Sequence, residues 1–230
     1  MLSAFDGYAH DEQSLHDLKL TARRSRTKRA VDILLSAMGL LFLSPALLMI
    51  AIALLLVDGR PIIYRHARVG REGRTFQCLK FRSMRRDADK RLAELLEREP
   101  ERKKEWLATR KLMNDPRVHW LGKYLRMSSA DELPQLLNVL RGEMSLVGPR
   151  PIVAAELERY GSQLHCYLAL QPGITGLWQV TRCADTSYEE RVQFDVDYYH
   201  TCSFGTDVTI LWKTVGVVLL ARNEKERLTK

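Results

Sequence analysis

The stretch ILLSAMGLLFLSPALLMIAIALLLV, from Ile33 to Val57, decides the fold, because no charged residue interrupts its 25 positions. As one straight helix it would be about 37 Å long, enough to cross a hydrocarbon core of about 30 Å. Pro45 lies at its centre, with twelve residues on either side. Each arm alone would reach only about 18 Å. A proline removes one helical hydrogen bond, and a neighbouring serine hydroxyl can occupy the freed carbonyl in lipid. The pair Ser44-Pro45 therefore predicts a kink in a membrane helix.

Basic residues flank the apolar segment on both sides. They are Arg23, Arg24, Arg26, Lys28 and Arg29 before it, and Arg60, Arg65, Arg68, Arg71 and Arg74 after it. Positive flanks stay in the cytosol, so two positive ends favour a re-entrant helix over residues 29–57 that enters the membrane and returns. A kinked full span and a buried core helix are the alternatives. Residues 1–28 are interpreted as a flexible basic tail, because the apolar run is too long for a secretory signal and no cleavage site follows it.

Composition narrows the class of partner. The 230-residue chain has a formal net charge of +8, which suits nucleic acid, anionic lipid or a phosphorylated small molecule. The chain has no helix-turn-helix, zinc-finger or aromatic-basic motif, so we expect no nucleic acid partner. Its four cysteines form no CxxC pair and its histidines no metal-binding spacing. Reduced cytosolic thiols are the expected state.

The rest of the chain predicts an α+β fold that is mostly helical, with a soluble domain over residues 58–205. The expected elements are a small hairpin of strands 61–65 and 74–81 with a turn at 70–73, and helices at 84–98, 101–112 and 156–170. Residues 206–222 form an amphipathic stretch that carries Trp212 and Lys213. This pattern predicts a C-terminal interfacial helix, with a core-packing helix as the alternative.

The densest polar chemistry surrounds Asp131-Glu132. Ser129 and Glu132 have the spacing of a capping box, so these acids could simply begin a helix. Cations argue for more. Arg117, Lys123 and Arg126 lie within fifteen residues upstream, Arg150 lies downstream, and Lys80 and Arg82 lie at the end of the second predicted strand. Arg150 stands between two prolines on a stiff turn, and its guanidinium can bind two phosphate oxygens. Carboxylates among cations beside a membrane suit phosphoryl transfer, in which one acid attacks phosphorus and another holds Mg²⁺.

Several motifs in order resemble the bacterial sugar transferase family, the monotopic polyprenyl-phosphate hexose-1-phosphate transferases. They are Lys80-Phe-Arg-Ser-Met84, Asn114-Asp-Pro-Arg117, Ser129-Ala-Asp-Glu-Leu-Pro-Gln-Leu-Leu-Asn138, Met144-Ser-Leu-Val-Gly-Pro-Arg-Pro151 and Pro172-Gly-Ile-Thr-Gly-Leu-Trp-Gln179. The resemblance extends from about Lys28 to Leu220. It implies that Ser44-Pro45 marks the family's re-entrant helix and that the catalytic domain faces the cytosol at the bacterial inner membrane.

The resemblance also implies roles for individual residues. Asp131 matches the nucleophile that attacks a UDP-sugar and releases UMP, and Glu132 matches its partner in a Mg²⁺-dependent dyad. Lys80, Arg126 and Arg150 match basic positions around the phosphates. The expected acceptor is undecaprenyl phosphate, and the expected donor is UDP-glucose or UDP-galactose, because the stretch around residues 160–168 is similar to members that initiate exopolysaccharide synthesis.

Two positions depart from the family pattern. Thr181-Arg-Cys-Ala184 stands where the family usually has a Gly-Arg-Asn-like turn. Near Cys202 the family commonly has a tryptophan, which this sequence lacks there. Both concern contacts to the sugar or the nucleotide. They keep open a second hypothesis, a non-catalytic membrane-anchored scaffold in a polysaccharide assembly complex. The sequence leaves the oligomeric state open, a homo-oligomer included.

Overall fold

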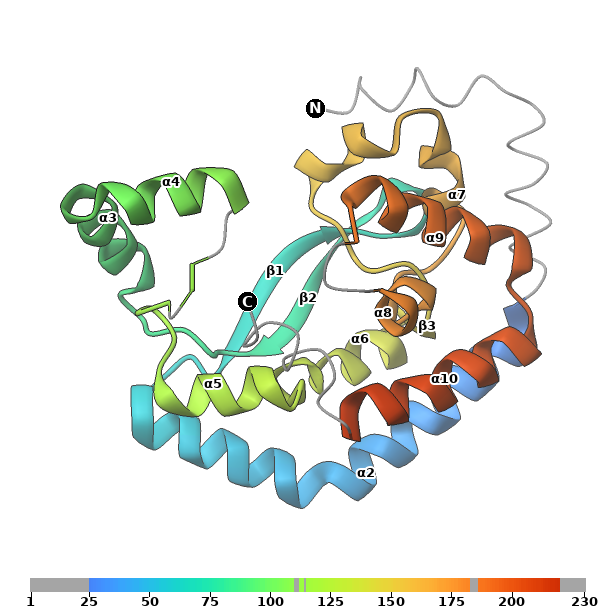
Figure 1. Cartoon of the computed structure of the whole chain (residues 1–230). Coiled ribbons are helices and arrows are strands. Elements are labelled where there is room, and N and C mark those ends of the chain that lie inside the picture. Colours follow the sequence, from blue (N-terminus) through green and yellow to red (C-terminus); the bar gives the residue numbers. More distant parts are fainter. Residues whose placement is uncertain (1–24, 110–111, 114, 183–185, 220–230) are drawn as a thin grey trace. The chain divides into compact units, whose positions relative to one another are not determined.

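The computed structural model describes residues 25–109, 112–113, 115–182 and 186–219 (Figure 1). Most of the tail predicted at 1–28 lies outside these residues. The chain divides into two compact units. In the described residues, the first unit runs to Ser44 and also holds Arg65–Leu79 and the chain from Pro134 onward, whereas the second unit holds Pro45–Tyr64 and Lys80–Leu133.

The apolar segment forms the helix α2, Ser25–Asp58, which contains Pro45. Among the described helices it alone is long and apolar enough to cross a membrane. Pro45 cannot donate to the carbonyl of Leu41, and the Ser44 hydroxyl donates to that oxygen at 2.8 Å instead. The expected role of the serine is confirmed. Only 6% of the most apolar part of α2 is buried, which argues against a core helix.

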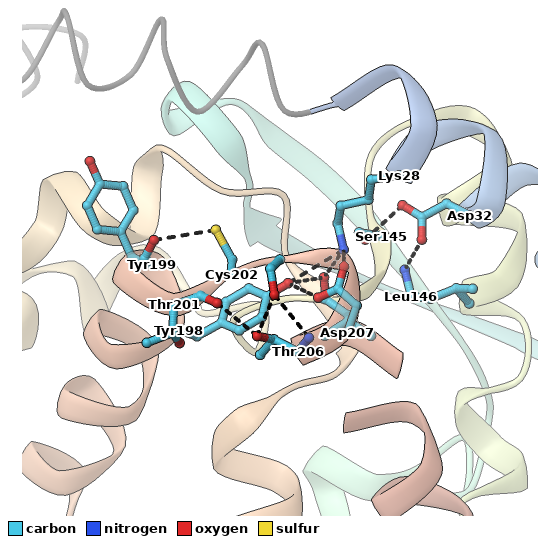
Figure 2. Close-up of polar contacts among 12 residues, drawn as sticks. Lys28, Asp32, Ser145, Leu146, Tyr198, Tyr199, Thr201, Cys202, Thr206 and Asp207 are labelled. Atoms are coloured by element: carbon cyan, nitrogen blue, oxygen red, sulfur yellow. Dashed lines mark hydrogen bonds and ion pairs between the residues drawn. The ribbon is translucent and has the colours of Figure 1, made fainter. Parts of the chain in front are cut away.

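Polar contacts hold the beginning of α2 within the first unit (Figure 2). Asp32, only 3% exposed, accepts hydrogen bonds from the Ser145 hydroxyl at 2.8 Å and the Leu146 amide at 3.1 Å. The Lys28 ammonium lies 2.6 Å from an Asp207 carboxylate oxygen and donates to the Val147 carbonyl at 3.0 Å. A buried carboxylate needs such donors to offset its lost hydration. The sequence reading missed Asp32, which directly precedes the apolar run.

Contacts in the second unit hold the other end of α2. Leu54 is 1% exposed and clusters with Phe81 and Leu125. Asp58 forms an ion pair with Arg82 at 2.8 Å, and the same guanidinium donates to the Asp58 and Gly59 carbonyls. Arg82 thereby binds the carbonyls that a helix end leaves without partners.

The predicted hairpin is present as β1, Ile63–Val69, and β2, Thr75–Phe81. β1 starts and ends later than expected. Pro61 has no amide hydrogen to donate, and the far end of the strand is extended by the bridge from Val69 to Ile152.

A second sheet, of two short strands, was not predicted from the sequence. β3, Ser145–Val147, pairs in parallel with β4, Gly173–Thr175. A Cβ on Gly148 or Gly176 would collide with backbone atoms of Gln171 or of Gly148, so these motif glycines permit the close approach of the two segments.

The remaining helices of the described chain are α3 Ala88–Arg98, α4 Pro100–Thr109, α5 Trp120–Met127, α6 Gln135–Arg141, α7 Leu164–Leu168, α8 Leu177–Thr181, α9 Tyr188–Thr201 and α10 Phe204–Leu219. The helices expected at 84–98 and 101–112 are present as α3 and α4 with shifted bounds, whereas α5, α6, α8 and α9 were not predicted. Pro100 opens α4, as its fixed φ allows. The helix expected from residue 84 begins four residues later, because Met84 bridges to Val118 and the Arg85 amide donates to the Arg117 carbonyl.

The helix predicted at 156–170 is wrong as a single element. A 3₁₀ segment, Ala154–Gln163, precedes α7, and Gly161 interrupts it with a φ of 48°. Tyr160 and Tyr167 from this region enter a buried cluster with Val192 and Val196 of α9. The C-terminal helix occupies Phe204–Leu219, and residues 220–222 of the prediction lie outside the described chain.

Candidate active site

Lys80 and Glu132 meet in the second unit although 52 positions separate them in the sequence. Lys80 lies near the end of β2, and Glu132 closes the 3₁₀ turn Ala130–Glu132. Nζ of Lys80 donates to Oε1 of Glu132 at 2.6 Å, and about a quarter of each side chain is exposed. Solvent can therefore reach the ion pair while it orients both groups.

The capping box predicted at Ser129 is wrong. Ser129 has a φ of 57°, in the left-handed region, and its side chain makes no capping hydrogen bond. Glu132 uses its carboxylate for Lys80 instead. Such a backbone conformation is strained for a residue with a Cβ. The turn therefore serves to present the two acids rather than to begin α6, whose N-cap is Pro134.

Asp131 is the buried member of the dyad, with 8% of its surface exposed. Burial raises the pKa of its carboxyl above 3.8, the positive charges of Lys80 and Arg126 oppose that rise, and Glu132 adds to it. Within the described part of the chain, no cation lies within 4 Å of this carboxylate. A carboxylate that is poorly hydrated and not neutralised by a direct ion pair is available as a nucleophile.

Arg126, on α5, approaches the dyad from the same unit. Its Nε donates to the Ser83 hydroxyl at 2.8 Å, and Ser83 is 7% exposed. Sequence reasoning identified Arg126 but assigned no role to Ser83. The only signal was the position of Ser83 inside a motif. Gly122 of α5 lies so close to the Ser83 backbone that a Cβ there would collide with the Ser83 carbonyl.

Two other predicted phosphate-binding residues are already engaged by acids. Arg82 binds Asp58 at the end of α2. Arg117 is 8% exposed, forms a bidentate pair with Asp115 whose shortest contact is 2.6 Å, and stacks over Trp106 at 4.7 Å. A phosphate at either arginine would have to compete with an existing carboxylate.

Arg150 belongs to the first unit and follows β3. Its guanidinium carbon lies 6.0 Å from the centre of the Trp178 ring, which Arg182 and Arg191 approach to 4.7 and 5.1 Å. Arg191 also pairs with Glu156 at 3.4 Å. The stiff Pro-Arg-Pro turn thus places Arg150 in a cluster of arginines on one aromatic ring, which attracts anions.

Asn138, the last residue of the motif Ser129–Asn138, has a structural role. It is fully buried on α6, accepts a hydrogen bond from the Leu79 amide and donates to the Gln77 carbonyl. This amide therefore binds α6 to β2 directly before Lys80.

The donor set of the dyad fits Mg²⁺. This ion usually binds one or two carboxylates and completes its coordination with water and substrate phosphates. Asp131 and Glu132 provide two adjacent carboxylates. The described residues contain no cluster of three or more acid, histidine or cysteine ligands, so phosphates and water would complete the coordination.

Comparisons with known proteins agree on one family. A model of bacterial sugar transferases matches residues 23–221. The exopolysaccharide production protein ExoY of Rhizobium meliloti (strain 1021) is 48% identical over 195 residues, which cover 85% of this chain and 86% of that protein.

Longer relatives are also similar. The undecaprenyl-phosphate galactose phosphotransferase of Salmonella typhimurium is 46% identical over 92% of this chain and 45% of its own length. The UDP-glucose:undecaprenyl-phosphate glucose-1-phosphate transferase of Escherichia coli (strain K12) is 38% identical over 87% of this chain and 42% of its own length.

Proposed function

Because the chain belongs to the bacterial sugar transferase family, we propose that it transfers a hexose 1-phosphate from a UDP-sugar to undecaprenyl phosphate and releases UMP. The sugar is glucose or galactose, and the product initiates exopolysaccharide or related glycan synthesis. Relatives of both sugar types carry these substrates in their names. The carboxylate dyad supports this class of reaction, and the apolar helix α2 supports a location of the protein at the membrane.

The observation that carries the proposal is the environment of Asp131: a buried carboxylate that makes no direct ion pair with the described residues and lies beside the Lys80–Glu132 pair. A carboxylate oxygen of Asp131 attacks the phosphorus that bears the sugar. A bond from oxygen to phosphorus forms, and the bridging bond to the second phosphate breaks, so UMP leaves with the electron pair. An oxygen of undecaprenyl phosphate then attacks the same phosphorus and frees Asp131.

The neighbouring groups have distinct roles in this scheme. Lys80 holds Glu132 and keeps positive charge near the ionised Asp131, and Arg126 is held by Ser83 toward phosphate oxygens. Asp131 and Glu132 would hold Mg²⁺, which would partly neutralise the negative charge of the diphosphate.

A re-entrant α2 at the cytosolic face is part of the same proposal. The start of α2 is held by Ser145 and Leu146, and its end packs with Phe81 and Leu125. The chain between residues 59 and 219 connects these groups, and its described part contains no second helix apolar enough to cross a membrane. Both ends of α2 then belong on one side of the bilayer.

The C-terminal helix α10 is proposed to lie at the membrane surface. Phe204, Val208, Trp212 and Val215 are about half exposed or more, at spacings of three or four residues. An apolar stripe with a tryptophan on it suits the lipid headgroup boundary.

Release of UMP tests the enzymatic proposal. Detergent-solubilised protein is incubated with Mg²⁺, undecaprenyl phosphate and a panel of UDP-sugars. We expect turnover with one or two UDP-hexoses, almost none in Asp131→Asn, and full turnover in the control Asp87→Asn, whose carboxylate is exposed on another element. Equal turnover by Asp131→Asn would overturn the nucleophile. No UMP from any sugar would favour the scaffold hypothesis.

Cysteine labelling tests the topology. Arg26→Cys and Arg60→Cys, both exposed positions, are made in a background without the four native cysteines. Both should react with an impermeant reagent only from the cytosolic side, whereas Phe42→Cys in the apolar segment should be protected. Labelling of one end from the outside would establish a full span.

A further inference from the structure

The turn Pro149-Arg150-Pro151 has few hydrogen-bond donors of its own. Neither proline carries an amide hydrogen, so the backbone of the turn is fixed mainly through its carbonyl oxygens. Both prolines are buried, whereas Arg150 is partly exposed. The conformation of the turn therefore depends on the donors that other segments of the first unit supply to it.

Each of the three consecutive carbonyls of this turn accepts from a different donor. The amide of Gly173 donates to the first at 2.8 Å. The guanidinium of Arg191 donates to the second at 3.5 Å, and the guanidinium of Arg68 donates to the third at 3.1 Å. Two of the three donors are therefore charged side chains, from β1 and α9, and all of them belong to the first unit.

Glu156 links these two arginines. Its Oε1 lies 3.4 Å from Nη1 of Arg191, and its Oε2 lies 3.8 Å from Nη1 of Arg68. Oε2 also accepts from the amide of Val153 at 2.9 Å, which fixes the carboxylate relative to the chain that leaves the turn. One carboxylate thus faces both cations that hold the turn.

The bridge has an electrostatic reason. The side chains of Arg68 and Arg191 are only 19% and 10% exposed, so water screens their charges weakly. Burial lowers the pKa of Arg68, the positive charge of Arg150 lowers it further, and the charge of Glu156 opposes the change. Without Glu156, the guanidinium groups around the turn would lose the carboxylate that bridges them.

We propose that Glu156 is a positioning residue for phosphate binding at Arg150. It keeps Arg68 and Arg191 beneath the turn, and the turn directs the guanidinium of Arg150. Glu156 acts through the two arginines and not through contact with the phosphate. A guanidinium whose backbone is already fixed loses less entropy when it binds two phosphate oxygens. This inference rests on the proposed function, because it takes the phosphate to be that of the UDP-sugar.

Calorimetric titration of the detergent-solubilised full chain with UDP and Mg²⁺ tests this role. Glu156→Gln keeps an oxygen for the amide of Val153 but removes the negative charge between the arginines. We expect its Kd for UDP to rise about tenfold, the effect of weakening one charge-assisted contact to phosphate. The matched control Glu158→Gln changes an exposed carboxylate of the same 3₁₀ segment and should bind UDP as the parent does.

A second background separates positioning from general stabilisation of the fold. In Arg150→Ala, the further change Glu156→Gln should leave the Kd unchanged, because the arginine through which Glu156 acts is absent. Equal losses of affinity in both backgrounds would overturn the proposal. A parent chain that does not bind UDP, or an Arg150→Ala variant that binds it as tightly as the parent, would overturn it as well.

The variant Arg191→Lys provides the test if Glu156→Gln fails to fold. It keeps the positive charge but not the planar group of donors, so it should weaken UDP binding in the parent and not in Arg150→Ala. In UMP release by Glu156→Gln, the KM for the UDP-hexose should rise while kcat changes less than about twofold. UDP binding that depends on Glu156 in a chain that releases no UMP would contradict the proposed reaction alone.

Discussion

Replacement of Asp32 by alanine should destabilise the protein strongly, although Asp32 lies far from the dyad in sequence. Asp32 is 3% exposed and accepts from the fully buried Ser145 hydroxyl and from the Leu146 amide (Figure 2). Each hydrogen bond to a charged group contributes about 1.5–3 kcal/mol, and the buried Ser145 hydroxyl would be left without an acceptor. The alanine variant also avoids the cost of desolvating the carboxylate, which offsets part of this loss. We therefore expect the free energy of unfolding to fall by about 3 kcal/mol.

Thermal unfolding in detergent measures this loss. For a chain of this size, about 3 kcal/mol lowers the melting temperature by about 9 °C. Asp32→Asn keeps one acceptor and should lose about half as much. The control Asp89→Ala removes an exposed carboxylate and should leave the melting temperature unchanged.

A double-mutant cycle tests how much of this loss of stability comes from the hydrogen bond between Asp32 and Ser145. In a Ser145→Ala background, Asp32→Ala should cost less than it does alone, because one of its two bonds is already absent. A folded Asp32→Ala protein that melts within about 2 °C of the parent would refute the reasoning, because the carboxylate would not then be a buried acceptor.

Three further predictions concern the dyad, the core and α5. Lys80→Met should move the acid limb of the UMP-release profile to higher pH, because Asp131 must be ionised and the Lys80 charge opposes the rise in its pKa; an unchanged limb would contradict this. Burial raises the pKa of Asp195 from 3.8 to about 6, so the folded state holds this proton more tightly and stability falls as pH rises through that window; melting curves of Asp195→Asn should lose this slope. Gly122→Ala should displace α5 from Ser83 and reduce UMP release more than about tenfold, whereas retained activity would show that the helix tolerates the methyl group.

Local features of the sequence determined several parts of the protein. The length and apolarity of residues 33–57 required a long membrane-competent helix, and the proline at its centre required another donor for the Leu41 carbonyl. The Ser44 hydroxyl is that donor. Pro100 marked the division between two charged helices, because proline suits the first position of a helix. These signals depend on neighbours within one or two turns, so the sequence alone contains them.

Only the tertiary structure decided the environment of the dyad. The sequence predicted Asp131 and Glu132 as one pair. The tertiary structure brings β2 alongside their turn, and this contact buries Asp131 and makes Glu132 the partner of Lys80. The same holds for the β3–β4 pairing and for the acceptor role of Asp32. Hydrogen bonds and desolvation are set by the atoms that folding brings together from distant parts of the sequence, and no local pattern of side chains records them.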